Sequence, residues 1–158
     1  MDNPFAILTA IVAPAILTNA CSVLCLGTGN RIARVVDRTR VVNGEISALS
    51  KESPDYRIRV NQLERLQNRS QLLIRALRTF YAALGSFAAA ALVSVIGSVL
   101  TYYNLTFAFH AAGVLGLLVG VYGVVNLITG LSRALRETRL AVHDLGEEAE
   151  LARNKFAG

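Results

Sequence analysis

Few residues of this chain combine the types and the spacing that catalysis or metal binding requires. The two histidines, His110 and His143, fall at opposite ends of one expected helix, so they cannot meet within one copy of the chain. Cys21 and Cys25 lie one helical turn apart within an apolar run. No HExxH, CxxC or GxSxG motif occurs. We therefore expect a protein that is not an enzyme and has no catalytic residue, metal or cofactor, and we interpret the cysteines as small apolar helix residues.

Arginines that flank three long apolar runs, at residues 5–27, 82–100 and 107–130, are the strongest candidates for ligand contacts. The ends of these runs are the expected membrane boundaries. The arginines are Arg31, Arg34, Arg75, Arg78, Arg133 and Arg136. Long basic side chains at this depth reach out to anionic lipid headgroups, which makes the bilayer the expected partner. An anion-selective ring or gate in an oligomer is the alternative. A nucleic-acid partner is not expected, because no aromatic residues are interleaved with the basic ones.

Four polar residues lie within the apolar runs. They are Thr18, Asn19, Ser22 and Asn126. Hydrogen bonds between helices are the simpler interpretation, and the lining of a pore is the alternative. The runs contain no Asp, Glu, Lys or Arg, which argues against a proton-coupled or ion-coupled transporter built on charged sites.

Two glycine patterns could permit a close approach. The stretch 27–30 (Gly-Thr-Gly-Asn) lacks the Lys-Ser/Thr of a phosphate-binding loop, so we interpret it as a junction at the membrane exit. A second pattern repeats every three or four residues along the last apolar run, at Gly113, Gly116, Gly120 and Gly123. Such lines promote close helix packing, either within one chain or between copies.

Three apolar runs must position these residues. Hydrophobic residues make up 53% of the 158-residue chain, and they concentrate at residues 5–27, 82–100 and 107–130. Runs of about 20 apolar residues are long enough to cross the hydrocarbon layer. The sequence therefore predicts an all-α membrane protein with three transmembrane helices, organised as a single domain over residues 1–158.

The polar segment 30–81 is expected to form a helical hairpin. Ile32, Val35, Thr39, Val42, Ile46 and Leu49 are spaced as the apolar seam of a coiled coil. Leu63, Leu66, Ser70, Leu73, Leu77 and Phe80 repeat this spacing. Between them, Ser53 suits a helix N-cap and Pro54 the first helical position. The first arm should therefore end near Ser50 and the second should begin near Pro54.

The C-terminal segment 131–156 carries a third stripe of the same kind. Its members are Leu131, Leu135, Thr138, Val142, Leu145, Ala149, Ala152 and Phe156. We expect this helix to complete a coiled-coil-like stalk of three helices. No proline interrupts the junctions between spans and arms, so helices of roughly 40–50 residues should run unbroken from membrane to stalk.

Charge predicts the orientation. Residues 28–79 contain eleven Lys/Arg and five Asp/Glu, whereas the N-terminus and the 101–106 turn contain no basic residue. The positive-inside rule then places the hairpin and the C-terminus in the cytoplasm and the N-terminus outside. At matching heights, Glu147, Glu148 and Glu150 should face the basic hairpin.

Three short stretches of the chain form a recognisable pattern. They are Ala13-Pro14-Ala15 in the first run, Asn30-Arg31 at its exit, and the following stretch 34–40 (Arg-Val-Val-Asp-Arg-Thr-Arg). In these stretches the sequence resembles a family of small, uncharacterised bacterial inner-membrane proteins. The resemblance implies a bacterial inner membrane and supplies no activity or substrate.

Three spans alone rarely enclose a site, and the apolar seams favour self-association. We therefore expect a homo-oligomeric membrane protein, which could surround a channel-like pathway lined by the first helix. The alternative is an accessory or scaffold subunit whose stalk docks onto a larger partner.

Overall fold

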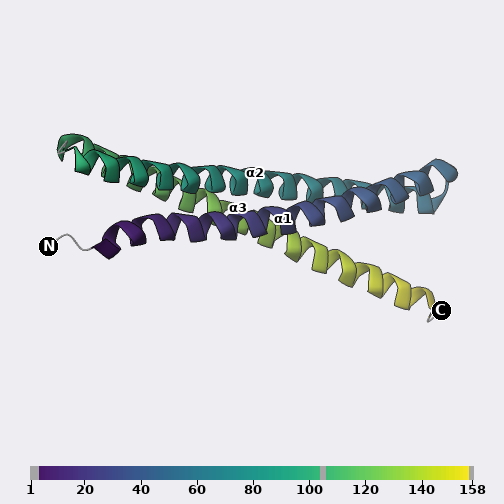
Figure 1. The fold of residues 1–158 in the computed structure, drawn as a ribbon. Helices are drawn as coiled ribbons and strands as arrows, with labels where there is room; N and C mark the ends of the chain where they lie inside the picture. The colour runs from purple at the N-terminus through teal and green to yellow at the C-terminus, as the bar shows by residue number, and fades with distance from the viewer. Residues whose placement is uncertain (1–3, 104–105, 157–158) are drawn as a thin grey trace. The chain divides into compact units, whose positions relative to one another are not determined.

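Three long helices joined by two short turns make up the described part of the chain. They are α1 (Pro4–Ala48), α2 (Pro54–Tyr102) and α3 (Thr106–Phe156) (Figure 1). This computed structural model describes residues 4–103 and 106–156, and it describes side chains for residues 12–100, 103, 106–143 and 146. The helices contain 45, 49 and 51 residues, which confirms the prediction of long unbroken helices.

The turn between α1 and α2 is the predicted one. Pro54 begins α2, and the backbone N–H of Asp55 donates to the Ser53 hydroxyl at 3.3 Å. A side-chain oxygen at this position satisfies one of the N–H groups that a helix start leaves without a partner. Ser53 is therefore the N-cap, as its sequence context predicts.

Contacts within the chain divide it into two units. The apolar unit comprises Met1–Gly27 and Leu77–Gly130, and the polar unit comprises Thr28–Ala76 and Leu131–Gly158. The glycine-rich stretch 27–30 lies within α1 and is helical, so it does not form a phosphate-binding loop.

In the polar unit, the two predicted seams pack together as the core of the hairpin. Val35, Val42, Leu66 and Leu73 form a buried cluster, and partly buried Ile32, Ile46 and Leu63 pack against it. Burial recurs at alternating intervals of three and four residues along both arms, as coiled-coil packing requires. The prediction of two ordered arms is confirmed.

The described leucine and valine members of the third stripe do not pack on this hairpin. Leu131 is 38% exposed, Leu135 62% and Val142 65%. The helix contacts the hairpin through Glu137, on a neighbouring face, and through Thr138, a polar member of the stripe. The C-terminal end of α3, drawn in yellow, also separates from the hairpin in Figure 1. For these residues the predicted seam is wrong, because the charged contacts of α3 turn its apolar stripe outward.

The prediction for Glu147, Glu148 and Glu150 lies outside the described side chains.

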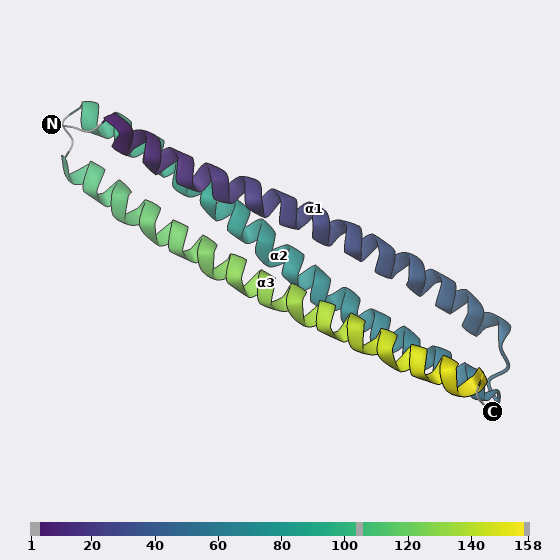
Figure 2. The same cartoon turned by 90° about the horizontal axis from the view of Figure 1, so that it is seen from below.

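In the apolar unit, α2 and α3 run antiparallel (Figure 2) and pack closely at two glycines. A Cβ on Gly130 would lie 2.5 Å from Phe80 Cε1, and a Cβ on Gly123 would lie 2.8 Å from Phe87 Cε1. Cys21 of α1 is buried in one cluster with Phe87 and Ala83. Phenylalanine rings therefore fill the space that the missing side chains leave.

Each helix contains a segment long and apolar enough to cross a membrane, judged by length and composition. Only 17%, 28% and 6% of the most apolar windows of α1, α2 and α3 are buried within the chain. A soluble protein rarely exposes apolar surface on this scale. The low burial is typical of helices covered by lipid or by other copies.

Candidate functional site

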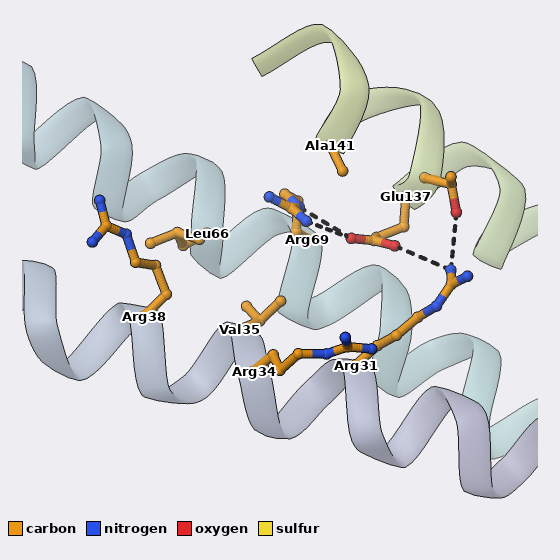
Figure 3. A pocket seen from close by; sticks show the side chains of 9 residues that line it. Arg31, Arg34, Val35, Arg38, Leu66, Arg69, Glu137 and Ala141 are labelled. Atoms are coloured by element: carbon orange, nitrogen blue, oxygen red, sulfur yellow. Dashed lines mark hydrogen bonds and ion pairs between the residues drawn. The ribbon is translucent and has the colours of Figure 1, made fainter. Parts of the chain in front are cut away.

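A buried glutamate brings the three helices of the polar unit together. Glu137 of α3 is 3% exposed, and its Oε1 accepts hydrogen bonds from Nε and Nη2 of Arg69 on α2, at 3.0 and 2.9 Å (Figure 3). A buried carboxylate is costly unless it is paired and hydrogen-bonded. Arg69 supplies both requirements from one guanidinium group.

Arg31 of α1 completes the cluster from the other side. Its Nη1 lies 3.7 Å from Glu137 Oε2 and donates a 2.9 Å hydrogen bond to the Thr138 hydroxyl. The Arg31 side chain is 46% exposed, so water screens its attraction to the carboxylate. The Arg69–Glu137 pair is therefore the stronger half of the cluster.

A groove of about 320 Å³ opens beside this cluster. Its lining residues are Arg31, Arg34, Val35, Arg38, Leu66, Arg69, Glu137, Thr138 and Ala141. The lining thus carries four arginines and one carboxylate, with apolar side chains from each of the three helices. Such a surface is chemically suited to an anion attached to an apolar or weakly polar group.

The six boundary arginines differ in their surroundings. Arg31 and Arg34 line the groove, and Arg133 donates to the backbone carbonyl of Arg75 at 3.2 Å. Arg136 is exposed in the polar unit, and Arg78 is exposed in the apolar unit.

Three of the four polar residues of the spans form hydrogen bonds within their own helices. Thr18 Oγ1 donates to the Pro14 carbonyl, Ser22 Oγ to the Thr18 carbonyl, and Asn126 Nδ2 to the Tyr122 carbonyl. Asn19 is exposed on α1. None of these three bonds joins two helices.

Only some glycines of the pattern in α3 lie close to another helix of the chain. Gly123 meets Phe87, and Gly116 would bring a Cβ to 3.5 Å from Val93. A Cβ on Gly113 or Gly120 would meet nothing within 4 Å. These two positions leave room for a neighbouring molecule.

The reactive side chains are dispersed. Cys21 and Cys25 are buried free cysteines in the apolar unit, and His110 Nδ1 lies 2.7 Å from the Thr106 carbonyl of its own helix. Within the described residues, no three His, Cys, Asp or Glu side chains group in a way that could hold a metal ion.

Comparison with known proteins identifies the family. The sequence profile of a family described as a protein of unknown function, DUF2721, matches residues 11–146. The chain belongs to the DUF2721 family. No curated protein and no solved structure matches the sequence.

The groove of this DUF2721 chain includes three residues that the sequence interpretation missed: Arg38, Arg69 and Glu137. All three lie within the matched range. The sequence contains one indication of this contact. Glu137 is the single acidic residue between Ser132 and His143, and arginines surround it in the sequence. An isolated carboxylate in such a context marks a charged contact between helices.

Proposed function

We propose that this DUF2721 protein is a non-enzymatic, homo-oligomeric protein of the bacterial inner membrane. In this proposal the three apolar segments cross the bilayer. The hairpin and the end of α3 lie in the cytoplasm, and the N-terminus lies outside, as the basic excess of residues 28–79 favours. The boundary arginines then reach the anionic lipid headgroups.

The exposed stripe on α3 carries the proposal of an oligomer. Leu135 and Val142 lie beyond the apolar unit, yet they are 62% and 65% exposed within the chain. Apolar residues at coiled-coil spacing are stabilised when the same spacing on another helix faces them. We therefore assign this surface to oligomer formation.

A second copy is the occupant best suited to this stripe. Each copy enters the cytoplasm from its own third span, so all copies would present the stripe in one direction and at one height. Two such helices can then pair in parallel and in register without shifting along each other. This pairing suits the rotational symmetry of most homo-oligomers. A larger partner docking on the same stripe is the alternative, in which the protein is a scaffold subunit.

Native mass spectrometry of the full chain in detergent micelles tests the oligomer. We expect a discrete oligomer that Leu135→Gln with Val142→Gln shifts toward monomer. Leu140→Gln is the matched control, because Leu140 is 45% exposed on the same helix but lies off the stripe. A monomeric wild-type protein would overturn the proposal. A monomer that co-purifies with a constant partner would support the scaffold instead.

A conducting pathway is a more specific form of the oligomer proposal. Asn19 and Ser22 are exposed on α1 within a largely apolar span, which favours contact with water or with another copy over contact with lipid. Ion flux into liposomes containing the oligomer tests this form. Flux that Asn19→Leu reduces would support it, whereas the absence of flux from a confirmed oligomer would exclude it.

A further inference from the structure

Three arginines on one face of α1 border the groove beside Glu137. Arg31, Arg34 and Arg38 are separated by three and four residues, so they lie above one another on successive turns. Val35 lies between them on this face and contributes to the buried core. The basic edge of the groove is therefore fixed to the packed part of the hairpin.

The carboxylate of the groove forms no ion pair with Arg34 or Arg38 and only a long one with Arg31. Glu137 is bound by Arg69, with Arg31 only at 3.7 Å from its second oxygen. Arg34 and Arg38 have no hydrogen-bond or ion-pair partner among the residues that the structure describes. Three guanidinium groups thus border one groove that contains a single, already paired carboxylate, and this leaves a local excess of positive charge.

We infer that this groove binds a phosphate group, and that an anionic phospholipid headgroup is its source. Guanidinium groups bind phosphate through paired N–H donors, which suits the three arginines of α1. Val35, Leu66 and Ala141 supply apolar surface for the carbon atoms beside the phosphate. The volume of about 320 Å³ falls at the lower end of the range of small-molecule sites, about 300–1,000 Å³.

The position of the groove along the helices favours a lipid over a free anion. Arg31 comes four residues after the end of the apolar segment of α1, and Glu137 comes seven residues after that of α3. At about 1.5 Å per residue, these steps correspond to roughly 6 and 10 Å of helix. With the membrane placement proposed above, this is the depth of the lipid phosphates. Phosphate recognition itself does not depend on that placement, nor on the oligomer.

Arg69 has a different role from the three arginines of α1. Its Nε and Nη2 are both committed to Glu137, and its side chain is 23% exposed. It therefore holds α2 and α3 at the groove and is a positioning residue. The ligand contacts are assigned to Arg31, Arg34 and Arg38.

The test compares two double variants of equal charge in the full chain, purified in a neutral detergent. Arg34→Gln with Arg38→Gln removes two exposed, unpaired groove arginines, so folding should be preserved. Lys51→Gln with Arg57→Gln removes two exposed basic residues of the same hairpin away from the groove. Circular dichroism melting verifies that both variants fold.

Native mass spectrometry measures binding of phosphatidylglycerol and of phosphatidylcholine, and ³¹P NMR line broadening measures binding of inorganic phosphate. We expect the groove variant to weaken phosphatidylglycerol binding by roughly tenfold or more and the control variant to leave it near wild type. A third result is that inorganic phosphate binds with the same dependence on Arg34 and Arg38, while the protein shows no preference for phosphatidylglycerol over phosphatidylcholine. This result would retain the phosphate site and assign it to a free anion.

Equal losses of phosphatidylglycerol binding in the two variants would show that net charge alone attracts the lipid, and this would overturn the inference. Absence of binding by both phosphatidylglycerol and inorganic phosphate would also overturn it. Mass spectra report the oligomer in the same samples. Failure of the phosphate site is therefore distinguishable from failure of the oligomer proposal.

Discussion

Arg69 directs two donors, Nε and Nη2, to one oxygen of Glu137, and the two side chains differ strongly in exposure. The glutamate side chain is 5% exposed and the arginine side chain 23%. Water can reach the arginine if the pair is broken, but it cannot readily reach the carboxylate. The two partners therefore do not contribute equally to the cost of breaking the pair.

This asymmetry predicts unequal effects of removing either partner. Arg69→Leu strands a buried carboxylate and should lower the free energy of unfolding by about 3 kcal/mol. Glu137→Leu leaves a partly hydrated guanidinium and should cost less, about 1 kcal/mol. The double variant should recover most of the stability, because apolar replacement of a buried pair is often neutral. Chemical unfolding of the full chain in detergent, followed by circular dichroism, measures all three.

A second pair in the hairpin provides the control. Arg59 Nε lies 3.1 Å from Glu45 Oε2, but both side chains are 37% exposed. Arg59→Leu should therefore cost only about 0–1 kcal/mol. Equal costs for Arg59→Leu and Arg69→Leu would contradict the account of Glu137 as the centre of the polar unit.

The two close glycine contacts predict a graded response to alanine. Gly130→Ala places a Cβ 2.5 Å from Phe80 Cε1 and 2.8 Å from Thr79 Oγ1, and Phe80 is fully buried. Overpacking of this kind should cost about 1–3 kcal/mol. Gly120→Ala meets nothing within 4 Å, so it should not lower the thermal stability, and the higher helix propensity of alanine should raise it slightly. Tm values in detergent compare the two variants, and equal shifts would contradict the predicted packing.

The proposed orientation predicts which turn can be labelled from outside the cell. In a background with Cys21→Ala and Cys25→Ala, Tyr103→Cys should react with a membrane-impermeant maleimide added to intact cells. Ser53→Cys should react only after the cells are permeabilised. Both turns lie outside the helices, so accessibility rather than packing decides the result. Labelling of Ser53→Cys in intact cells would reverse the orientation.

Helix boundaries and the hairpin core could be predicted from the sequence, because local signals determine both. Ser53 and Pro54 satisfy the start of a helix by themselves, and α2 begins at Pro54. Val42 and Leu73 follow the spacing that brings two helices together, and both are fully buried. For these residues, propensity, spacing and tertiary packing favour the same structure.

The orientation of α3 could not be predicted in this way. Its heptad stripe predicts burial of Leu135 and Val142, whereas the contacts of Glu137 with Arg69 and Arg31 place a neighbouring face against the hairpin. Apolar spacing identifies a surface that favours burial without identifying the helix that buries it. The groove was missed for the same reason, since its residues come from three helices and meet only through packing.

The most direct measurement of the central claim is disulfide formation between copies in native membranes. In the background with Cys21→Ala and Cys25→Ala, Leu135→Cys lies on the exposed stripe and Leu140→Cys lies off it. Mild oxidation should give a product of twice the monomer mass for Leu135→Cys and much less for Leu140→Cys. Equal yields at the two positions, or no cross-linked product at either, would contradict an oligomer assembled through the stripe of α3.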